Sequence, residues 1–366
     1  MNPIPFGNLQ RHCFAIQKDI QQAIQEVLES GWFILGKKGE AFEQEFANYL
    51  GAYATIGVGS GTDAIEICLR ALTIGPGDEV ITAANTCVPT VTAISSVHAR
   101  VVLTDIHRDS FTMDPNDLAK RITKKTKAII PVHLYGQAAD LDPIYVIAKE
   151  KNIPVIEDAA QAHGTTYKGK KIGSEGQFVC FSFYPSKNLG ALGDGGAIAT
   201  NNRETAEKLK MLRNYGQFQR YYHSLKGVNS RLDEIQAAIL SAKLKYLDQW
   251  NRRRRRIAQM YSENLQNPRV QLPSEMQYGE HVYHLYVVRV KQRTKFRDYL
   301  SSHNIGTEIH YPIPVHLQKA YDDTGYTLGD FPATEQVCNE VVSLPMYPEL
   351  TDEEVMHICH VINSYL

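Results

Sequence analysis

The sequence lacks a long apolar run and lacks an excess of charge of either sign. No stretch reaches the roughly 18 apolar residues that a helix needs to cross a bilayer. Residues 1–6 have neither the charged nor the apolar segment of a signal peptide. Lys and Arg number 39 against 40 Asp and Glu, so the net charge of −1 offers no strong field to hold nucleic acid or a membrane surface. We therefore expect a cytoplasmic protein that binds neither.

Paired cysteines are also absent. The six cysteines are scattered and none forms a Cys-x-x-Cys pair, so we expect free thiols and no metal site or disulfide framework. Hydrophobic residues make up 43% of the chain and charged residues 22%, a balance that excludes a disordered or collagen-like chain. The length of 366 residues is enough for about two domains.

Helical and strand-like patterns alternate from about residue 15 to residue 240. Apolar residues recur at helical spacing from Ile16 to Leu28, and this pattern stops at Gly31. Helix-like stretches or turns separate most of the strand-like runs, which are 54–58, 79–82, 101–104, 128–132, 154–156, 178–181 and 197–199. The alternation predicts an α/β fold with a large, mostly parallel sheet flanked by helices.

The pattern changes after about Ser230. Residues 232–265 contain no proline or glycine and predict one long helix that leads out of the first domain. Beyond it the sequence predicts a strand at 284–290, a helix near 294–302 and an amphipathic helix over 352–365. We therefore expect a large α/β domain over residues 1–240 and a smaller α+β domain over residues 241–366.

Five consecutive arginines, Arg252–Arg256, form the only conspicuous charge run. Such a run is typical of a nucleic-acid-binding patch. Five consecutive residues, however, cover every face of a helix, and the net charge of the chain is −1. We interpret the run as part of a solvated or interface helix.

A glycine-rich turn, Gly57-Val-Gly59-Ser-Gly61-Thr62, lies between a predicted strand and a predicted helix. Glycines let a backbone approach an anion, and a helix N-terminus presents unpaired N–H groups to it. A dinucleotide fingerprint would need glycine at position 62, where threonine stands. Taken alone, the turn is either a phosphate site or a plain tight turn.

Two further segments place polar side chains after apolar strands. In Val155–Gly164, Asp158 ends a strand, where ligands of open α/β sheets bind, although a helix N-cap is the alternative interpretation. In Cys180–Gly196, Ser182 and Lys187 precede a glycine-rich stretch. An aspartate, a serine and a lysine at strand ends, with a glycine-rich helix start, fit pyridoxal phosphate held as a Schiff base.

The chain resembles the DegT/DnrJ/StrS family of nucleotide-sugar aminotransferases over nearly its whole length. The motifs that carry the resemblance occur in the family's order; they are Gly31-Trp-Phe-Ile-Leu-Gly36, Gly59-Ser-Gly-Thr-Asp63-Ala64, Glu157-Asp-Ala-Ala-Gln161, Ser186-Lys-Asn-Leu-Gly-Ala-Leu-Gly-Asp-Gly-Gly196, Asn229-Ser-Arg-Leu-Asp-Glu234 and His310-Tyr-Pro-Ile-Pro-Val-His316. The resemblance implies a fold type I, aspartate-aminotransferase-like architecture. It also implies a homodimer whose active sites are shared between subunits.

The resemblance implies pyridoxal 5'-phosphate (PLP) as the cofactor and Lys187 as the catalytic residue, which binds the cofactor and then moves a proton between Cα and C4′. Asp158 would pair with the pyridinium nitrogen, so that the ring accepts electrons. The other implied cofactor-binding residues are Gln161 at the 3-hydroxyl, Gly61, Thr62 and Ser182 at the phosphate, Asn229 reaching the phosphate from the neighbouring subunit, and Ala160 and Cys87. His163 receives no role and is interpreted as a hydrogen-bonded structural histidine.

One position departs from the family pattern. Many relatives carry an aromatic residue, stacked on the cofactor ring, where this chain has Cys87. Cys87 or Val88 can give van der Waals contact but no π stacking, so the departure affects the tightness of cofactor binding and leaves the chemistry unchanged.

The sequence of residues 186–196 is similar to that of family members that aminate C3 of dTDP-3-keto-6-deoxyhexoses. The resemblance thus implies transfer of the amino group of L-glutamate to such a nucleotide-linked keto sugar. The positions that match sites near the sugar and nucleotide, each of which can instead be a packed aromatic residue, are Phe33, Tyr184, His310 and Tyr311. A 4-aminotransferase acting on a 4-keto-6-deoxy nucleotide sugar remains an alternative. An NAD-dependent nucleotide-sugar epimerase or dehydrogenase would need the missing third glycine.

Overall fold

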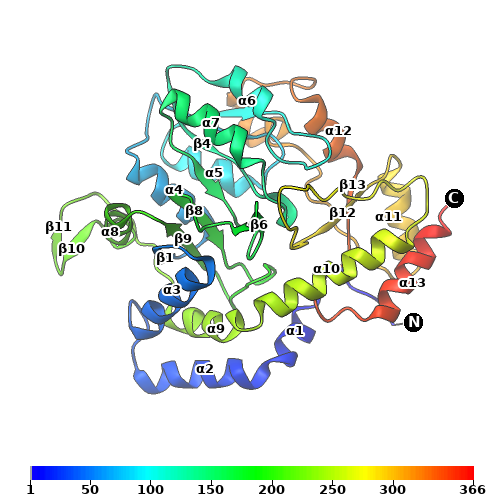
Figure 1. Cartoon of the computed structure of the whole chain (residues 1–366), viewed down its shortest axis with the longest axis horizontal. Coiled ribbons are helices and arrows are strands. Elements are labelled where there is room, and N and C mark those ends of the chain that lie inside the picture. Colours follow the sequence, from blue (N-terminus) through cyan, green and yellow to red (C-terminus); the bar gives the residue numbers. More distant parts are fainter. Residues whose placement is uncertain (1) are drawn as a thin grey trace.

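A single mixed sheet forms the centre of the computed structural model, which describes residues 2–366 (Figure 1). Parallel bridges at Ile129–Val155 and Val132–Asp158 join a three-stranded and a four-stranded sheet, giving the order β3-β2-β4-β5-β8-β9-β1. Within this order β9 alone runs in the opposite direction to all the other strands. The bounds are β1 (Ala54–Val58), β2 (Glu79–Ala83), β3 (Arg100–Thr104), β4 (Thr126–Ile130), β5 (Ile156–Asp158), β8 (Phe178–Ser182) and β9 (Gly196–Thr200). The predicted mostly parallel sheet is confirmed.

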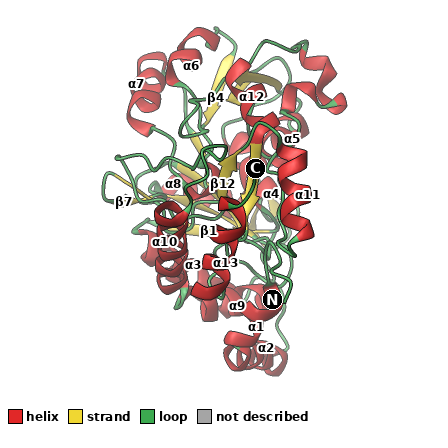
Figure 2. Cartoon of the chain, turned by 90° about the vertical axis from the view of Figure 1, so that its right-hand side faces the viewer, coloured by secondary structure: helices red, strands yellow, loops and turns green. Residues whose placement is uncertain are grey.

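Helices cover both faces of this sheet, and for this reason its strands are continuous apolar runs. On one face, the strands pack against α4 (Gly61–Ala71), α5 (Val88–Ser96) and α8 (Arg203–Leu212). On the other face lie α6 (Pro115–Arg121) and α7 (Leu141–Lys151), together with α3 (Lys37–Leu50) and α9 (Glu234–Leu244). Figure 2 shows the strands enclosed between helices in a second view.

The long helix expected over residues 232–265 is in fact two helices. They are α9 and α10 (Leu247–Asn264), which meet at Lys245 and Tyr246. The local sequence contains no helix breaker, so the break has a tertiary cause. The Tyr246 hydroxyl donates to Asp19 of α2 (Gln17–Ser30) at 2.6 Å, and its ring stacks on Trp250. Packing against α2 thus overrides the helical propensity of the sequence.

The C-terminal residues have an apolar core of their own. It is built from α10, an antiparallel pair of strands, β12 (Tyr286–Arg289) and β13 (Val341–Leu344), and two helices, α11 (Arg293–Ser302) and α13 (Asp352–Asn363). Ile4 joins this core and pairs with Ile305. The N-terminal segment that contains Ile4 continues into a short helix, α1 (Leu9–Ala15), which precedes α2. The expected boundary between residues 240 and 241 falls inside α9, and the two-domain division stays a prediction.

Two short pairs of strands lie outside the central sheet. Two strands, β10 (Gln217–Gln219) and β11 (Tyr222–His223), form an arm that projects from the body of the molecule (Figure 1). A second small pair is β6 (Thr166–Tyr167) and β7 (Lys170–Lys171). None of the helices formed by residues 2–366 has both the length and the apolar character that a membrane crossing needs. All six cysteines are free thiols, as expected.

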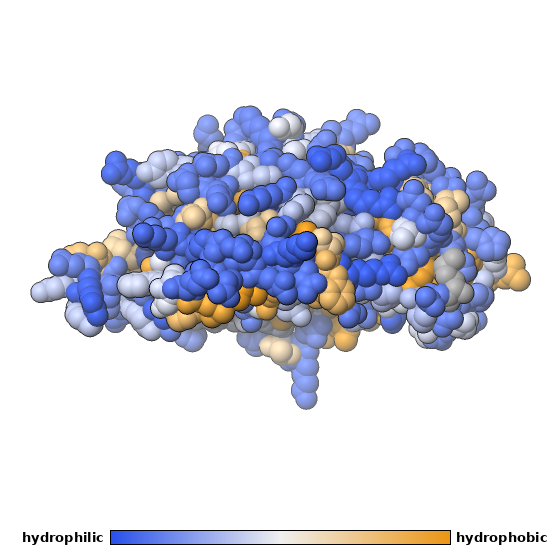
Figure 3. Space-filling model, turned by 90° about the horizontal axis from the view of Figure 1, so that it is seen from below, coloured by the Kyte–Doolittle hydropathy of each residue, from blue (hydrophilic) through white to orange (hydrophobic). Residues whose placement is uncertain are grey.

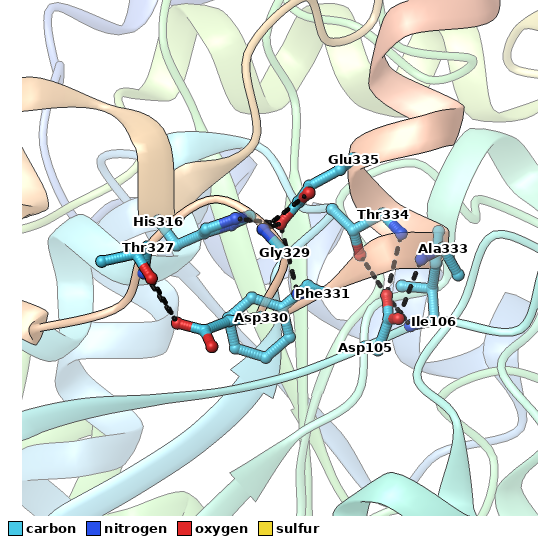
Figure 4. A network of polar contacts seen from close by, with 10 residues as sticks. All are labelled: Asp105, Ile106, His316, Thr327, Gly329, Asp330, Phe331, Ala333, Thr334 and Glu335. Atoms are coloured by element: carbon cyan, nitrogen blue, oxygen red, sulfur yellow. Dashed lines mark hydrogen bonds and ion pairs between the residues drawn. The ribbon is translucent and has the colours of Figure 1, made fainter.

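A polar network holds the segment after Tyr311 against α12 (Pro332–Glu340) (Figure 4). Glu335 accepts a hydrogen bond from the N–H of Gly329 at 2.8 Å and lies 3.0 Å from Nε2 of His316. Asp105, just after β3, accepts from N–H groups in the first turn of α12 at 2.9 and 2.8 Å. These N–H groups have no acceptor within the helix, so Asp105 acts as its cap from a distant part of the chain.

Candidate active site

A cavity of about 350 Å³ lies at the carboxyl ends of β5 and β8, beside the start of α4. This is the edge at which open α/β sheets bind ligands. It brings together residues that are more than 200 positions apart in the sequence. The predicted site residues that line it are Gly61, Thr62, Cys87, Asp158, Ala160, Gln161, Ser182, Tyr184, Lys187, His310 and Tyr311.

The start of α4 forms one end of the cavity. The side chain of its N-cap, Ser60, accepts a hydrogen bond from the N–H of Asp63 at 3.1 Å, which leaves the N–H groups of Gly61 and Thr62 without acceptors in the helix. A Cβ at Gly61 would lie 2.7 Å from Cβ of Ser182. Glycine is therefore required for β8 to bring the Ser182 hydroxyl to this helix end. Together these donors and the helix dipole make an anion-binding corner.

The carboxylate of Asp158 is buried and held on both oxygens. The Thr90 hydroxyl donates to Oδ2 at 2.8 Å, and the N–H of Ala160 donates to Oδ1 at 3.1 Å. The Thr86 hydroxyl lies 2.8 Å from that of Thr90 and extends the chain of hydrogen bonds. Asp158 caps no helix here, so the N-cap interpretation is wrong.

Lys187 sits in a tight loop after β8. Its N–H donates to the carbonyl of Tyr184 at 2.9 Å, and a Cβ at Gly190 would lie 2.4 Å from the carbonyl oxygen of Pro185. The buried Lys243 donates to the carbonyl of Gly190 at 2.6 Å, which fixes the far side of the loop. Burial lowers the pKa of the Lys187 amine, while the nearby Cys87 and Asp158 act in the opposite direction. A lysine reacts as a nucleophile only when its amine is neutral, and a lowered pKa makes the amine neutral at a lower pH.

Gln161 and Tyr311 close the opposite wall. The side-chain carbonyl of Gln161 accepts from the N–H of Tyr135 at 2.7 Å, and its amide donates to the Tyr311 hydroxyl at 3.1 Å. One amide N–H of Gln161 is left over for a ligand. Burial raises the pKa of the Cys87 thiol, so it is present as a small neutral group. Burial also lowers the pKa of His310 to about 4, so its ring is neutral at pH 7.

Two predicted site residues do not line this cavity. Phe33 is 47% exposed and lies in the loop between α2 and α3. Asn229 is exposed and pairs with Asn214. Its neighbour Ser230 does contact the anion-binding corner at the start of α4, because the Ser230 hydroxyl donates to Asp63 at 2.6 Å. Asn229 thus borders the site but makes no part of its wall within one chain.

The interpretation of His163 as a hydrogen-bonded residue is wrong. Its ring is fully buried, yet neither ring nitrogen has a hydrogen-bond partner among the described residues. It packs at a tilt against Phe181 and Phe183, with ring centroids 5.5 and 5.8 Å away. Burial lowers its pKa to about 3, so the ring is neutral and behaves as an apolar aromatic side chain.

Sequence reasoning missed Thr90 and His284. Thr90 lies in the first turns of α5, and His284 precedes β12 and also lines the cavity. The Nδ1–H of His284 donates to the side chain of Asn188, 3.2 Å away. Neither residue follows a strand at a recognisable spacing, and each reaches the site only through tertiary packing: Thr90 donates to Asp158, and His284 donates to Asn188, which follows Lys187. No local sequence signal could have identified them.

Comparisons with known proteins place the chain in a family. Residues 15–363 match the family model described as the DegT/DnrJ/EryC1/StrS aminotransferase family. The dTDP-3-amino-3,6-dideoxy-alpha-D-galactopyranose transaminase of Aneurinibacillus thermoaerophilus is 52% identical over 362 residues, which cover 99% of each chain.

Solved structures agree with this match. DesV from S. venezuelae, in complex with a ketimine intermediate, has a TM-score of 0.98 and 42% identity, and the match covers 99% of this chain and 98% of DesV. NtdA from Bacillus subtilis, with bound cofactor PMP, has a TM-score of 0.91 and 34% identity, covering 100% of this chain and 86% of NtdA. The fold type I architecture expected from the sequence is thereby confirmed. The chain belongs to the DegT/DnrJ/EryC1/StrS aminotransferase family.

Proposed function

We propose that this protein is a PLP-dependent aminotransferase that moves the amino group of L-glutamate to C3 of a dTDP-3-keto-6-deoxyhexose, giving a dTDP-3-amino-3,6-dideoxyhexose. The observation that carries the proposal is the cavity that places an amine of lowered pKa, Lys187, beside the buried carboxylate of Asp158 and an anion-binding helix end. The 52% identity to a transaminase of a dTDP-3-amino-3,6-dideoxyhexose supports the choice of substrate. The cytoplasmic location expected from the sequence stays a prediction.

The donors and acceptors of the cavity fit PLP. The N–H groups of Gly61 and Thr62 and the hydroxyl of Ser182 are a phosphate site, and Asp158 is an acceptor for a protonated pyridine nitrogen. Gln161 keeps an amide N–H for the ring 3-hydroxyl. Cys87 lies in the cavity wall with Pro89 and offers the ring van der Waals contact.

When bound, PLP supplies an aldehyde carbon for the amino group and a ring that accepts the electrons released at Cα. Asp158 would keep a proton on the ring nitrogen, because a carboxylate favours the cation it pairs with. Thr90 and the N–H of Ala160 orient that carboxylate. Lys187, once its amine is free, would carry a proton between Cα and C4′ at short range. The same residues serve both halves of a ping-pong reaction.

The substrate assignment is tested by the position of the new nitrogen. Incubated with L-glutamate and a mixture of 3-keto and 4-keto forms of a dTDP-6-deoxyhexose, the enzyme is expected to yield only the 3-amino sugar. NMR of the purified product locates the nitrogen through the shifts and couplings of the attached proton. Nitrogen on C4 would contradict the proposal in favour of the 4-aminotransferase alternative. The NAD-dependent alternative has lost its basis, since the chain belongs to an aminotransferase family.

We further propose a homodimer in which Asn229 reaches the phosphate corner of the partner's site. Asn229 is exposed and does not line the cavity of its own chain. It follows the projecting β10–β11 arm, on which Phe218 and Tyr221 are 60% and 77% exposed. Figure 3 shows hydrophobic residues on the face that carries α2. Trp32, in the loop after α2, is 62% exposed. Large apolar groups at the surface are typical of a subunit interface.

Subunit complementation tests this arrangement. A Lys187→Ala chain is mixed with an Asn229→Ala chain under conditions that exchange subunits. In a mixed dimer, one site carries both defects and the other is intact, so random pairing gives about a quarter of wild-type sites. We expect activity to rise toward that fraction above either parent. If both parents are impaired and exchange is proven by mass spectrometry, no gain would mean that Asn229 serves its own chain.

A further inference from the structure

A second cavity, of about 390 Å³, lies on the far side of Lys187 from the Asp158 wall. It is lined by the N-terminal segment around Phe6–Leu9, by Arg254 of α10 and by the loop after β13. Ser186, Lys187, His284 and His310 line both cavities. A molecule held in the second cavity therefore borders Lys187. Its volume is in the range of small-ligand sites.

Unpartnered polar atoms gather around this cavity. Among residues 2–366, seven fully enclosed side-chain polar atoms have no hydrogen-bond partner. Three of them belong to residues that line the second cavity: Nε of Arg254, the hydroxyl of Tyr347 and Oε2 of Glu349. Buried polar groups in folded proteins are nearly always satisfied. Their concentration at one place indicates a site built for a polar ligand.

Arg254 is the centre of this group, and the expectation of a solvated or interface run is wrong for it. Its neighbours Arg252 and Arg256 are exposed, but Arg254 is 6% exposed. Its Nη1 donates to the carbonyls of Tyr283 and Met346 at 3.2 and 3.0 Å. It forms no ion pair with a carboxylate of the described residues. A buried guanidinium without an anion is costly, so the site favours a negatively charged ligand.

The other titratable groups in the cavity leave this preference intact. Burial lowers the pKa of Arg254 only to about 10, so it stays charged at pH 7. His284 and His310 are neutral there, because burial lowers the pKa of each. Glu349 is engaged through Oε1 with Nδ1 of His12 at 2.8 Å. Glu308 lies at the exposed rim. The carboxylate of Glu349 favours the charged form of Arg254 from a distance but forms no ion pair with it, so the guanidinium has no anion in direct contact.

We propose that this second cavity binds the amine donor, with a carboxylate of the amino acid on Arg254 and the Tyr347 hydroxyl as a further donor. This inference rests on the proposed aminotransferase function and assigns the donor's position in it. A carboxylate at Arg254 satisfies the guanidinium in the planar, paired geometry that arginine prefers. The amino group of the same molecule then faces the side of the cavity that Lys187 lines. The diphosphate of the nucleotide sugar is the other anion that an arginine binds in this geometry, and the amino-sugar half-reaction tests it separately.

The test separates the two half-reactions. Arg254→Met is compared with Arg252→Met, an exposed arginine of the same run without a hydrogen-bond partner. Conversion of the PLP form by L-glutamate alone is followed by its absorption band. For Arg254→Met we expect the half-saturating glutamate concentration to rise about 10- to 100-fold, the effect of losing a charged hydrogen bond. Conversion by the amino sugar is expected to stay unchanged, and Arg252→Met is expected to behave as wild type.

Glutarate, a dicarboxylate without an amino group, gives a readout that needs no turnover. Calorimetry is expected to detect its binding to the wild-type holoenzyme and to Arg252→Met, and a loss of about 10-fold or more in affinity in Arg254→Met. If wild-type enzyme is not converted by glutamate but binds glutarate through Arg254, the donor assignment in the proposed function fails while the carboxylate site stands. Tyr347→Phe, which removes one hydroxyl, replaces Arg254→Met as the test variant if Arg254→Met does not fold. For Tyr347→Phe we expect the half-saturating glutamate concentration to rise about 2- to 10-fold.

Two results would overturn the inference. One is a folded Arg254→Met enzyme with wild-type dependence on glutamate and wild-type glutarate binding. The other is an equal loss in both half-reactions, because a residue that only fixes the backbone at Tyr283 and Met346 would disturb both. Arg254→Lys refines the picture: it keeps the charge but loses the planar geometry, so an intermediate rise in half-saturation is expected.

Discussion

Replacing Lys187 with alanine is expected to lower turnover by at least about 10⁴-fold, the largest effect of any single change in this chain. The substitution removes both the amine that would bind the cofactor and the group that would move the proton at Cα. The cavity, the helix end at Gly61 and the carboxylate of Asp158 stay in place, so cofactor and nucleotide sugar are still expected to bind. Steady-state kinetics measure the loss, and equilibrium dialysis with PLP measures the retained binding.

A matched control is Lys170→Ala. Lys170 lies in the small β6–β7 pair and is exposed, and its amine forms an ion pair with Glu175, so its loss is expected to leave turnover unchanged. Borohydride reduction of the wild-type holoenzyme followed by peptide mapping should place the cofactor label on Lys187. A label on the other buried lysine of this region, Lys243, would contradict the assignment.

The pH dependence of labelling follows from the burial of Lys187. Burial lowers the pKa of its amine. At any pH below the pKa of an exposed lysine, a larger fraction of Lys187 than of an exposed lysine is therefore neutral and reactive. As the pH falls from alkaline values, labelling of exposed lysines by PLP and borohydride should fade first. The ratio of Lys187 label to surface label is therefore expected to rise, and a constant ratio would show that the amine is unshifted.

The parts of the site that could be predicted are those in which polar residues follow apolar strands. Asp158 and Ser182 end β5 and β8, and strand ends in an α/β fold converge at one edge whatever the details of packing. The glycine at position 61 was informative for the same reason, since it begins the helix after β1 and its missing Cβ admits Ser182. These local rules hold before any tertiary contact is known.

The parts that could not be predicted depend on contacts between distant segments. Thr90 reaches Asp158 across 68 positions, and Arg254 reaches the carbonyl of Met346 across 92. The break between α9 and α10 is set by Tyr246 and its partner Asp19, 227 positions away. A run of arginines predicts an exposed segment, because a sequence pattern does not show which of the five side chains faces the interior. Burial of Arg254 is a property of the packed chain, not of the run.

Asp158→Asn is expected to keep the fold and to lower turnover by about 100-fold or more. The amide is neutral and close in shape, so it loses the charged hydrogen bond to the ring nitrogen while filling the same space. Thr90, which donates to Oδ2 of the carboxylate at 2.8 Å, can still donate to an amide oxygen. The defect should therefore be in the proton held on the ring and not in the position of residue 158.

Glu157→Gln provides the comparison that makes this result specific. Glu157 is the neighbouring residue of β5 and makes the same change from carboxylate to amide, but its side chain points to the other face of the sheet, toward His133 at 3.0 Å and Tyr145 at 2.6 Å. It does not line the cavity. We expect its turnover to stay near wild type even if its melting temperature falls. Near-normal turnover in Asp158→Asn would mean that another residue serves the ring nitrogen. An equal loss of turnover in both variants would mean that the effect comes from the fold, because of these two carboxylates only Asp158 lines the site.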